Sequence, residues 1–179
     1  MKPILIASAA VLAASAAAFA HSGATGVVKE RMDQMGVIAK SMKAIGGMMK
    51  GEVAYDASVV QAEATMIASH GGETLTKLFP EGSTKHPSEA LPAIWTDWER
   101  FEAIAMDLSR YATALSDGAG NERGLAGGGL SSGGLSSSGG LTANGSGDAD
   151  LASMSPDDLF MKVAGTCSAC HQDFRQKKE

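Results

Sequence analysis

Apolar residues recur at intervals of three and four in four stretches of this 179-residue chain, over about 25–50, 56–79, 96–115 and 155–174. This spacing places them along one face of an α-helix. No stretch shows the apolar–polar alternation with hairpin turns that predicts β-strands. We therefore expect an all-α fold, an antiparallel four-helix bundle, which is an architecture that commonly builds cofactor sites between facing helices.

Two capping residues and a loop divide the predicted helices. Asp56 and Ser155 are suited to cap the second and fourth helices, because their side chains accept hydrogen bonds from the free N–H groups of a first turn. The third helix is expected to begin near 96–97. Residues 80–92 hold three prolines and a glycine, which predicts a loop before it.

The first twenty residues form a predicted export signal. A single Lys is followed by a mostly Ala, Leu, Ile and Val stretch that ends in the small-x-small pattern Ala18-Phe19-Ala20. The apolar stretch is shorter than the roughly 20 residues that a membrane-spanning helix needs. We expect residues 1–20 to be removed, leaving a periplasmic single domain over 21–179 with no membrane span.

A Gly/Ser-rich segment spans residues 118–150. Its 33 residues hold 12 Gly and 6 Ser, and such sequences bury little apolar surface while losing much backbone entropy on ordering. We predict that the segment is a disordered insertion between the third and fourth helices. The rest of the mature chain, 159 − 33 = 126 residues, is enough for one domain.

Composition excludes several classes of function. Lys and Arg number 15 against 20 Asp and Glu, for a net charge of −5, whereas nucleic-acid binding calls for clustered basic residues. We therefore expect no nucleic-acid partner. No carboxylate pair, nucleophile–base pair or phosphate-binding loop indicates an enzyme.

The strongest chemical signal is the run Cys167-Ser168-Ala169-Cys170-His171 in the fourth predicted helix. C-x-x-C-H is typical of c-type haem attachment. On a helix, the two cysteines point the same way and can form thioethers with the two haem vinyl groups, while His171 can bind the iron axially. We expect one haem c per chain, attached covalently through Cys167 and Cys170, with His171 as the proximal ligand.

Three other interpretations of the cysteines fit less well. A thioredoxin-like dithiol would follow a strand in a βαβ setting. A structural zinc site would need two more ligands, and the other histidines, His21, His70 and His86, are far away in the sequence. A simple disulfide would leave His171 without a role.

Four segments together form a family pattern. They are VAGTCSACHQDFRQKK near the end of the chain, Arg31-x-x-x-Met35 in the first predicted helix, KGEVAYDAS before the second and LPAIWTD before the third. This pattern resembles class II cytochromes c, the family of cytochrome c prime and its low-spin relatives, over the whole mature chain except 118–150. The resemblance implies an antiparallel four-helix bundle, often a homodimer, with the haem near one end.

The resemblance also implies roles for four further residues. Met35 corresponds to the distal position: as a ligand it makes a six-coordinate His/Met iron suited to carrying electrons. If Met35 only packs above the ring, the iron is five-coordinate, as in cytochrome c prime, and binds nitric oxide or carbon monoxide. Arg31 corresponds to a position that reaches a haem propionate, Arg175 to one near the proximal histidine on the next helical turn, and Trp95 to one at the haem edge.

Each of these four residues also has an ordinary structural interpretation. Met35 can be core filler, since five of the nine methionines of the mature chain lie on the first helix. Arg31 and Arg175 can be solvated helix charges, and Trp95 a buried residue between helices. We expect a one-electron carrier that serves other exported redox proteins, with a five-coordinate gas-binding protein as the alternative.

We predict that deleting residues 118–150 leaves haem incorporation and thermal stability nearly unchanged, because the composition of the segment favours no packing. Haem absorbance per protein and a thermal melt of the holoprotein measure the two quantities. A large loss of folded holoprotein would show that the segment packs against the bundle.

Overall fold

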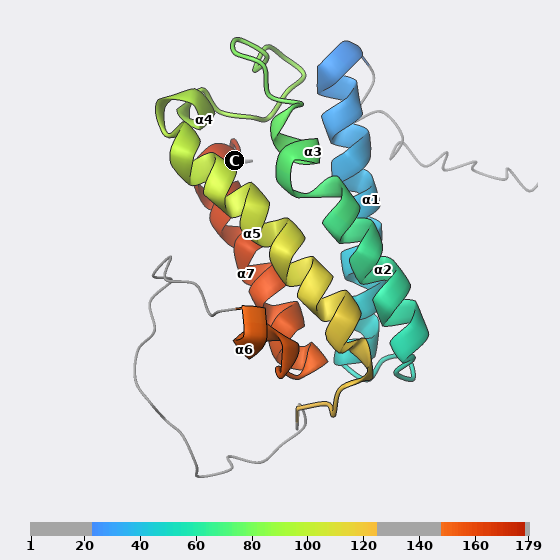
Figure 1. Ribbon diagram of the computed structural model, residues 1–179. Helices are drawn as coiled ribbons and strands as arrows, with labels where there is room; N and C mark the ends of the chain where they lie inside the picture. Colours follow the sequence, from blue (N-terminus) through green and yellow to red (C-terminus); the bar gives the residue numbers. More distant parts are fainter. Residues whose placement is uncertain (1–22, 125–147, 178–179) are drawn as a thin grey trace, which may run out of the picture.

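The computed structural model describes residues 23–124 and 148–177; the predicted signal peptide, 1–20, lies outside them. Four long helices form an antiparallel bundle (Figure 1), as predicted. They are α1 (Gly26–Met49), α2 (Ala57–His70), α5 (Trp98–Asp117) and α7 (Pro156–Phe174), and the short elements between them are α3 (Gly72–Thr76), α4 (Ala93–Thr96), the 3-10 turn η1 (Gly118–Gly120) and α6 (Asp148–Ala152). No helix in the described part of the chain is long and apolar enough to cross a membrane.

Side-chain caps begin α2 and α7 where the sequence predicts them. The Asp56 carboxylate accepts hydrogen bonds from the backbone N–H of Ser58 at 2.9 Å and of Val59 at 3.3 Å. The Ser155 hydroxyl accepts one from the backbone N–H of Asp158 at 3.1 Å. These bonds satisfy N–H groups that have no partner inside the helix.

The hydrophobic core has two parts. The main core runs along the bundle and draws buried side chains from every long helix, among them Ile38, Ile45, Val60, Ile67, Leu108, Ala112, Leu115, Leu159 and Val163. A second, mostly aromatic cluster consists of Ile94, Phe101 and Phe174. The second cluster joins α4 and the start of α5 to the last turn of α7, so it supports the end of the bundle that carries the cysteines.

The bounds predicted for the disordered insertion, 118–150, are too wide. Residues 118–120 form η1, and α6 occupies the far end of the segment. Ala119 from η1 and Leu151 from α6 are both buried in the main core. The composition of the segment does not predict these two structured ends, because they are held in place by a few contacts with the bundle and not by local sequence preferences. Disorder remains a prediction for 125–147, which the structure does not describe. The predicted tolerance of deletion narrows to these residues, because removal of the whole of 118–150 would also remove the buried Ala119 and the partner of Asp157, Arg123.

Arg123 joins the chain after η1 to the start of α7. The start of α7 lies at the end of the bundle opposite α4 (Figure 1). Its guanidinium donates to both carboxylate oxygens of Asp157, at 2.7 and 3.1 Å, and lies 4.6 Å from the centre of the Tyr55 ring. The Tyr55 hydroxyl donates to the backbone oxygen of Ala119 at 2.7 Å. Since the Asp157 side chain is only 12% exposed, its charge depends on Arg123.

Replacing Arg123 by Gln is therefore expected to lower the free energy of unfolding by about 1–3 kcal/mol, because Asp157 keeps its burial and loses its partner. Urea denaturation of the holoprotein with an unchanged m-value measures this loss. Arg100→Gln is the matched control: Arg100 pairs with Asp173 at 2.6 Å but is 55% exposed, and its loss should cost no more than about 1 kcal/mol. Equal losses would contradict the assigned role.

Candidate functional site

The two cysteines lie on one side of α7 but contact different parts of the core. Cys167 packs against the main core, and Cys170, almost one turn later, packs against the cluster of Ile94, Phe101 and Phe174. Both are free, half-buried thiols. Burial raises the pKa of both, that of Cys170 to about 11. The pair therefore presents two protonated sulfur atoms along one helix face, the arrangement that two thioether bonds to one ring need.

His171 follows directly on the same turn and lies at the surface. Partial burial of its ring, and next the positive charge of Arg175, lower its pKa, while Glu89 acts in the opposite direction. The neutral imidazole, which is the form that binds metals, is thus favoured at pH 7. His171 lines an open depression of about 480 Å³ together with Arg175, Gln176 and Lys177.

Helix geometry predicts that Met35 and His171 lie at the same level on facing sides of α1 and α7. The two helices are antiparallel (Figure 1), and they touch where the Phe160 ring lies against Gly46: a Cβ placed on Gly46 would be 3.5 Å from Phe160 Cζ. Met35 is eleven residues before Gly46, and His171 is eleven residues after Phe160. Eleven residues make three turns and about 16 Å of helix. Met35 therefore shares a side of α1 with Gly46, and His171 shares a side of α7 with Phe160. Both are displaced from the contact by the same distance, towards the same end of the bundle.

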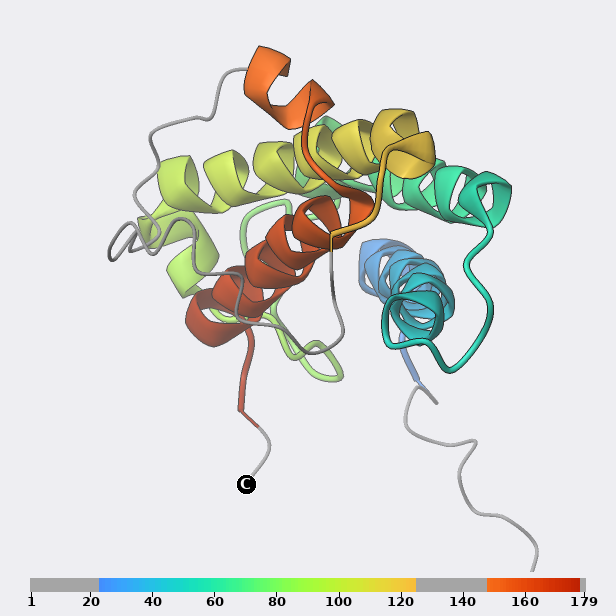
Figure 2. The ribbon, with the colours of Figure 1, turned by 90° about the horizontal axis from the view of Figure 1, so that it is seen from below.

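The α1–α7 pair is the loosest contact between neighbouring long helices. α5 packs along both α2 and α7, whereas α1 approaches α7 closely over a short stretch only. Viewed from below, α1 and α7 form one side of the bundle and α2 and α5 the other (Figure 2). The side-chain oxygen of Gln34, the residue before Met35, is buried without a hydrogen-bond partner among the described residues. A bound group nearby is one explanation for such an unpaired polar atom.

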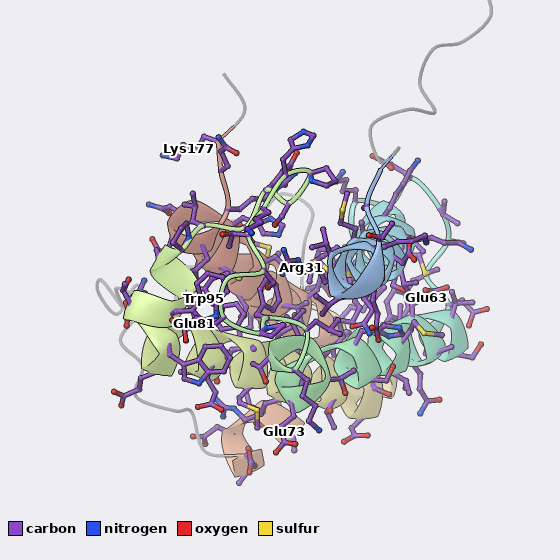
Figure 3. All side chains as sticks on the ribbon, turned by 90° about the horizontal axis from the view of Figure 1, so that it is seen from above. Arg31, Glu63, Glu73, Glu81, Trp95 and Lys177 are labelled. Atoms are coloured by element: carbon purple, nitrogen blue, oxygen red, sulfur yellow. The ribbon has the colours of Figure 1, made fainter. Side chains whose placement is uncertain are left out.

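Arg31 is buried, not a solvated helix charge. It donates to the backbone oxygen of Leu78 at 3.3 Å, to the Ser83 hydroxyl at 3.0 Å and backbone oxygen, and to the Ser88 hydroxyl at 2.5 Å. Its guanidinium also lies 4.8 Å from the centre of the Phe79 ring. In the view from above, Arg31 lies between α1 and α7 (Figure 3). The structure thus brings Arg31 to the predicted haem end, where it holds the loop before α4; its contact with a propionate stays a prediction.

Arg175 does not continue α7, contrary to the prediction that it lies on the next helical turn. The helix ends at Phe174, and Arg175 has extended backbone angles, φ −118° and ψ 137°. It forms an isolated antiparallel bridge with Ala90. Its side chain nevertheless reaches the depression beside His171 and binds the carboxylate of Glu89.

Trp95 lies in α4 and shares its surroundings with Cys170. Its indole N–H donates to the backbone oxygen of Phe79 at 3.0 Å, and its half-buried ring packs against the aromatic cluster that Cys170 also contacts. This position fits both expectations, a residue between elements and a residue near the attachment cysteines. Loop residues such as Ser83 and Glu89, which contact Arg31 and Arg175, escaped the sequence analysis because residues 80–92 follow no periodic pattern.

Among residues 23–124 and 148–177, no three His, Cys, Asp or Glu side chains come together as a metal site. The described part of the chain therefore offers no ligand set for the zinc alternative. It does offer what attachment of a c-type haem needs, two sulfur atoms on one helix face and an adjacent imidazole. Helix geometry predicts a thioether, that of Met35, across the least tightly packed pair of helices.

Comparisons with known proteins identify the family. The sequence model of the family described as Cytochrome C' matches residues 26–127, more than half of the chain. The chain belongs to the cytochrome c' family. Cytochrome c' of Rhodopseudomonas palustris is 30% identical to it over 155 residues, 86% of this chain and 84% of the relative. Cytochrome c-556 of Agrobacterium fabrum is 30% identical over 160 residues, 87% and 84% of the two chains.

Solved structures agree with this assignment. The structure of the R. palustris cytochrome c' is similar to this chain with a TM-score of 0.62 and 27% identity, covering 87% of this chain and 100% of that one. Proteins of the family bind one covalently attached c-type haem per chain, which confirms the expected cofactor. The family match ends at residue 127, so the C-x-x-C-H run is an independent observation on another part of the chain.

We predict that a Cys167→Ala/Cys170→Ala double variant holds no covalently attached haem, because both thioether sulfur atoms are absent. Acid–acetone extraction followed by haem staining of a denaturing gel checks this. Ser168→Ala, an exposed residue between the two cysteines, is the control and should retain full attachment. Haem that resists extraction in the double variant would contradict the assigned attachment sites.

Proposed function

We propose that this member of the cytochrome c' family is an exported one-electron carrier, with haem attached at Cys167 and Cys170 and the iron ligated by His171 and Met35. The observation that carries the proposal is the contact of Phe160 with Gly46, since helix geometry counted from that contact predicts equal heights for Met35 and His171 on facing sides of α1 and α7. A thioether as sixth ligand keeps the iron six-coordinate in both oxidation states and raises its reduction potential. Little reorganisation then accompanies the gain or loss of an electron.

Position distinguishes Met35 from the other methionines of α1. Met42 lies two turns further along the same side, and both are half-buried against the main core. Met42, however, is only four residues, about 6 Å, from the level at which Phe160 lies against Gly46. The helices touch there, so a ring between them has less room at the level of Met42 than further from the contact, at the level of Met35.

The second candidate function is that of a five-coordinate haem protein that binds nitric oxide or carbon monoxide. The similarity to R. palustris cytochrome c' favours it. A protein of the same fold, a ferrous variant of Alcaligenes xylosoxidans cytochrome c prime, has been solved with nitric oxide bound, at 22% identity and a TM-score of 0.58. In this alternative Met35 packs above the ring and leaves the sixth position open.

The export and the partners of the protein belong to the same proposal. Residues 1–20 have the composition of a signal peptide, and c-type haem is attached outside the cytoplasm, so the mature protein would act in the periplasm. Its partners would be other exported redox proteins, and association as a homodimer stays a prediction. The proposal is that the haem carries electrons and does not serve an enzymatic reaction.

Replacement of Met35 by Leu tests the sixth ligand, because Leu fills a similar volume and cannot bind iron. The reduced holoprotein is expected to show sharp low-spin optical bands that Met35→Leu loses, with a fall in reduction potential. Carbon monoxide should bind to the reduced variant about tenfold faster or more, since no ligand has to be displaced.

Met42→Leu is the matched control, from the same helix face and with similar burial. It is expected to keep the low-spin spectrum and slow carbon monoxide binding. A high-spin spectrum in the unsubstituted protein at neutral pH would refute the carrier proposal and favour the gas-binding alternative.

A further inference from the structure

The chain after α7 is held by its backbone against the loop that precedes α4. The Leu91 N–H donates to the backbone oxygen of Phe174 at 2.9 Å, and the Gln176 N–H donates to that of Glu89 at 2.7 Å. These two bonds flank the bridge described above. They bring the Glu89 side chain, from the loop, next to the residues that follow His171.

The Glu89 carboxylate binds the Arg175 guanidinium. Arg175 Nε donates to Glu89 Oε2 at 2.8 Å, and Nη2 donates to the same oxygen. The two side chains are 45% (Arg175) and 38% (Glu89) exposed, and ion pairs with such exposure contribute little to stability. The location of this ion pair near His171 therefore matters more for function than its contribution to the stability of the fold.

The pair borders the depression that contains His171. Arg175 and Lys177, two of the four residues that line this depression, are cations. Glu89 binds the side chain of Arg175 and the backbone of Gln176, so it contacts two of the four. It thereby brings a negative charge to the basic surroundings of the histidine and fixes the place of the Arg175 guanidinium.

We propose that Glu89 is a positioning residue for the proximal side of the haem: it holds Arg175 beside His171, offsets its charge and so sets the reduction potential of the iron. The inference rests on the proposed function in one respect, that His171 is the axial ligand. A negative charge near the iron favours the ferric state, and a positive charge favours the ferrous state. Removal of Glu89 takes a negative charge away from the surroundings of His171, and removal of Arg175 takes a positive charge away.

Glu89→Gln in the holoprotein tests the proposal, because Gln keeps the size of the side chain and an acceptor oxygen but carries no charge. Potentiometric titration is expected to show a higher reduction potential, with the ferrous-to-ferric ratio at a fixed applied potential raised about threefold to tenfold. Arg175→Gln is expected to lower this ratio. If Glu89→Gln fails to retain haem, the reduction potential of Arg175→Gln still tests the ion pair, because this substitution removes its positive partner.

The double variant Glu89→Gln/Arg175→Gln distinguishes a positioning role of Glu89 from two independent effects of charge on the reduction potential. If Glu89 places the guanidinium, the effects of the two substitutions are non-additive, since without the Glu89 carboxylate the Arg175 guanidinium is held less firmly beside His171 and its removal changes the potential by less. Exchange of the Gln176 amide hydrogen should stay slow in Glu89→Gln, because its acceptor is the backbone oxygen of residue 89.

Glu73→Gln is the matched control. Glu73 forms an exposed ion pair with Lys77 at 3.3 Å, and the view from above shows it on the opposite side of the molecule from Lys177 (Figure 3). The substitution makes the same change in charge and is expected to leave the potential unchanged.

Two results would overturn the proposal: a potential in Glu89→Gln equal to that of Glu73→Gln while the optical spectrum is unchanged, or additive effects in the double variant. Failure of the proposed function is a separate result. It would appear as His171→Ala holoprotein that keeps the axial ligation of the unsubstituted protein, whatever the potential of the Glu89 variants.

Discussion

The contact of Phe160 with Gly46 defines how α7 is aligned along α1, and the candidate haem site depends on that alignment. A helix turns by about 100° for each residue, so a slip of one residue would rotate Met35 or His171 away from the facing side. Three turns of rigid helix separate each residue from the contact. The alignment of α1 and α7 in the main core therefore also determines the relative positions of the iron ligands proposed at the other end of the bundle.

Contacts at two places along α7 hold the helix in this alignment. Cys167 contacts the main core and Cys170 contacts the aromatic cluster of α4, α5 and Phe174, so the helix is held on both sides of the motif. The loop before α4 adds a third attachment, since Arg31 binds it from α1 and the segment after α7 pairs with it. The residues around the proposed haem thus belong to one packed unit drawn from distant parts of the chain.

Family membership and the local geometry answer different questions. The match over residues 26–127 and the relatives at 30% identity establish the cytochrome c' family and its covalently attached haem. They leave the sixth ligand open, because one fold serves several functions and function depends on the site. The level of Met35 opposite His171, which follows from helix geometry and the contact of Phe160 with Gly46, is the basis of the electron-carrier proposal.

The sequence by itself determined the helices, two of their caps and the C-x-x-C-H motif, because periodicity, capping and haem attachment are all expressed over a few neighbouring residues. Only the tertiary structure decided that Arg175 leaves the helix, that residues at both ends of 118–150 belong to the bundle, and what Arg31 and Arg175 bind. Their partners are remote in sequence: Ser83 is 52 residues from Arg31, and Glu89 is 86 residues from Arg175. No local pattern records such pairs, because they form only when packing of the helices brings a loop without periodicity over the end of the bundle.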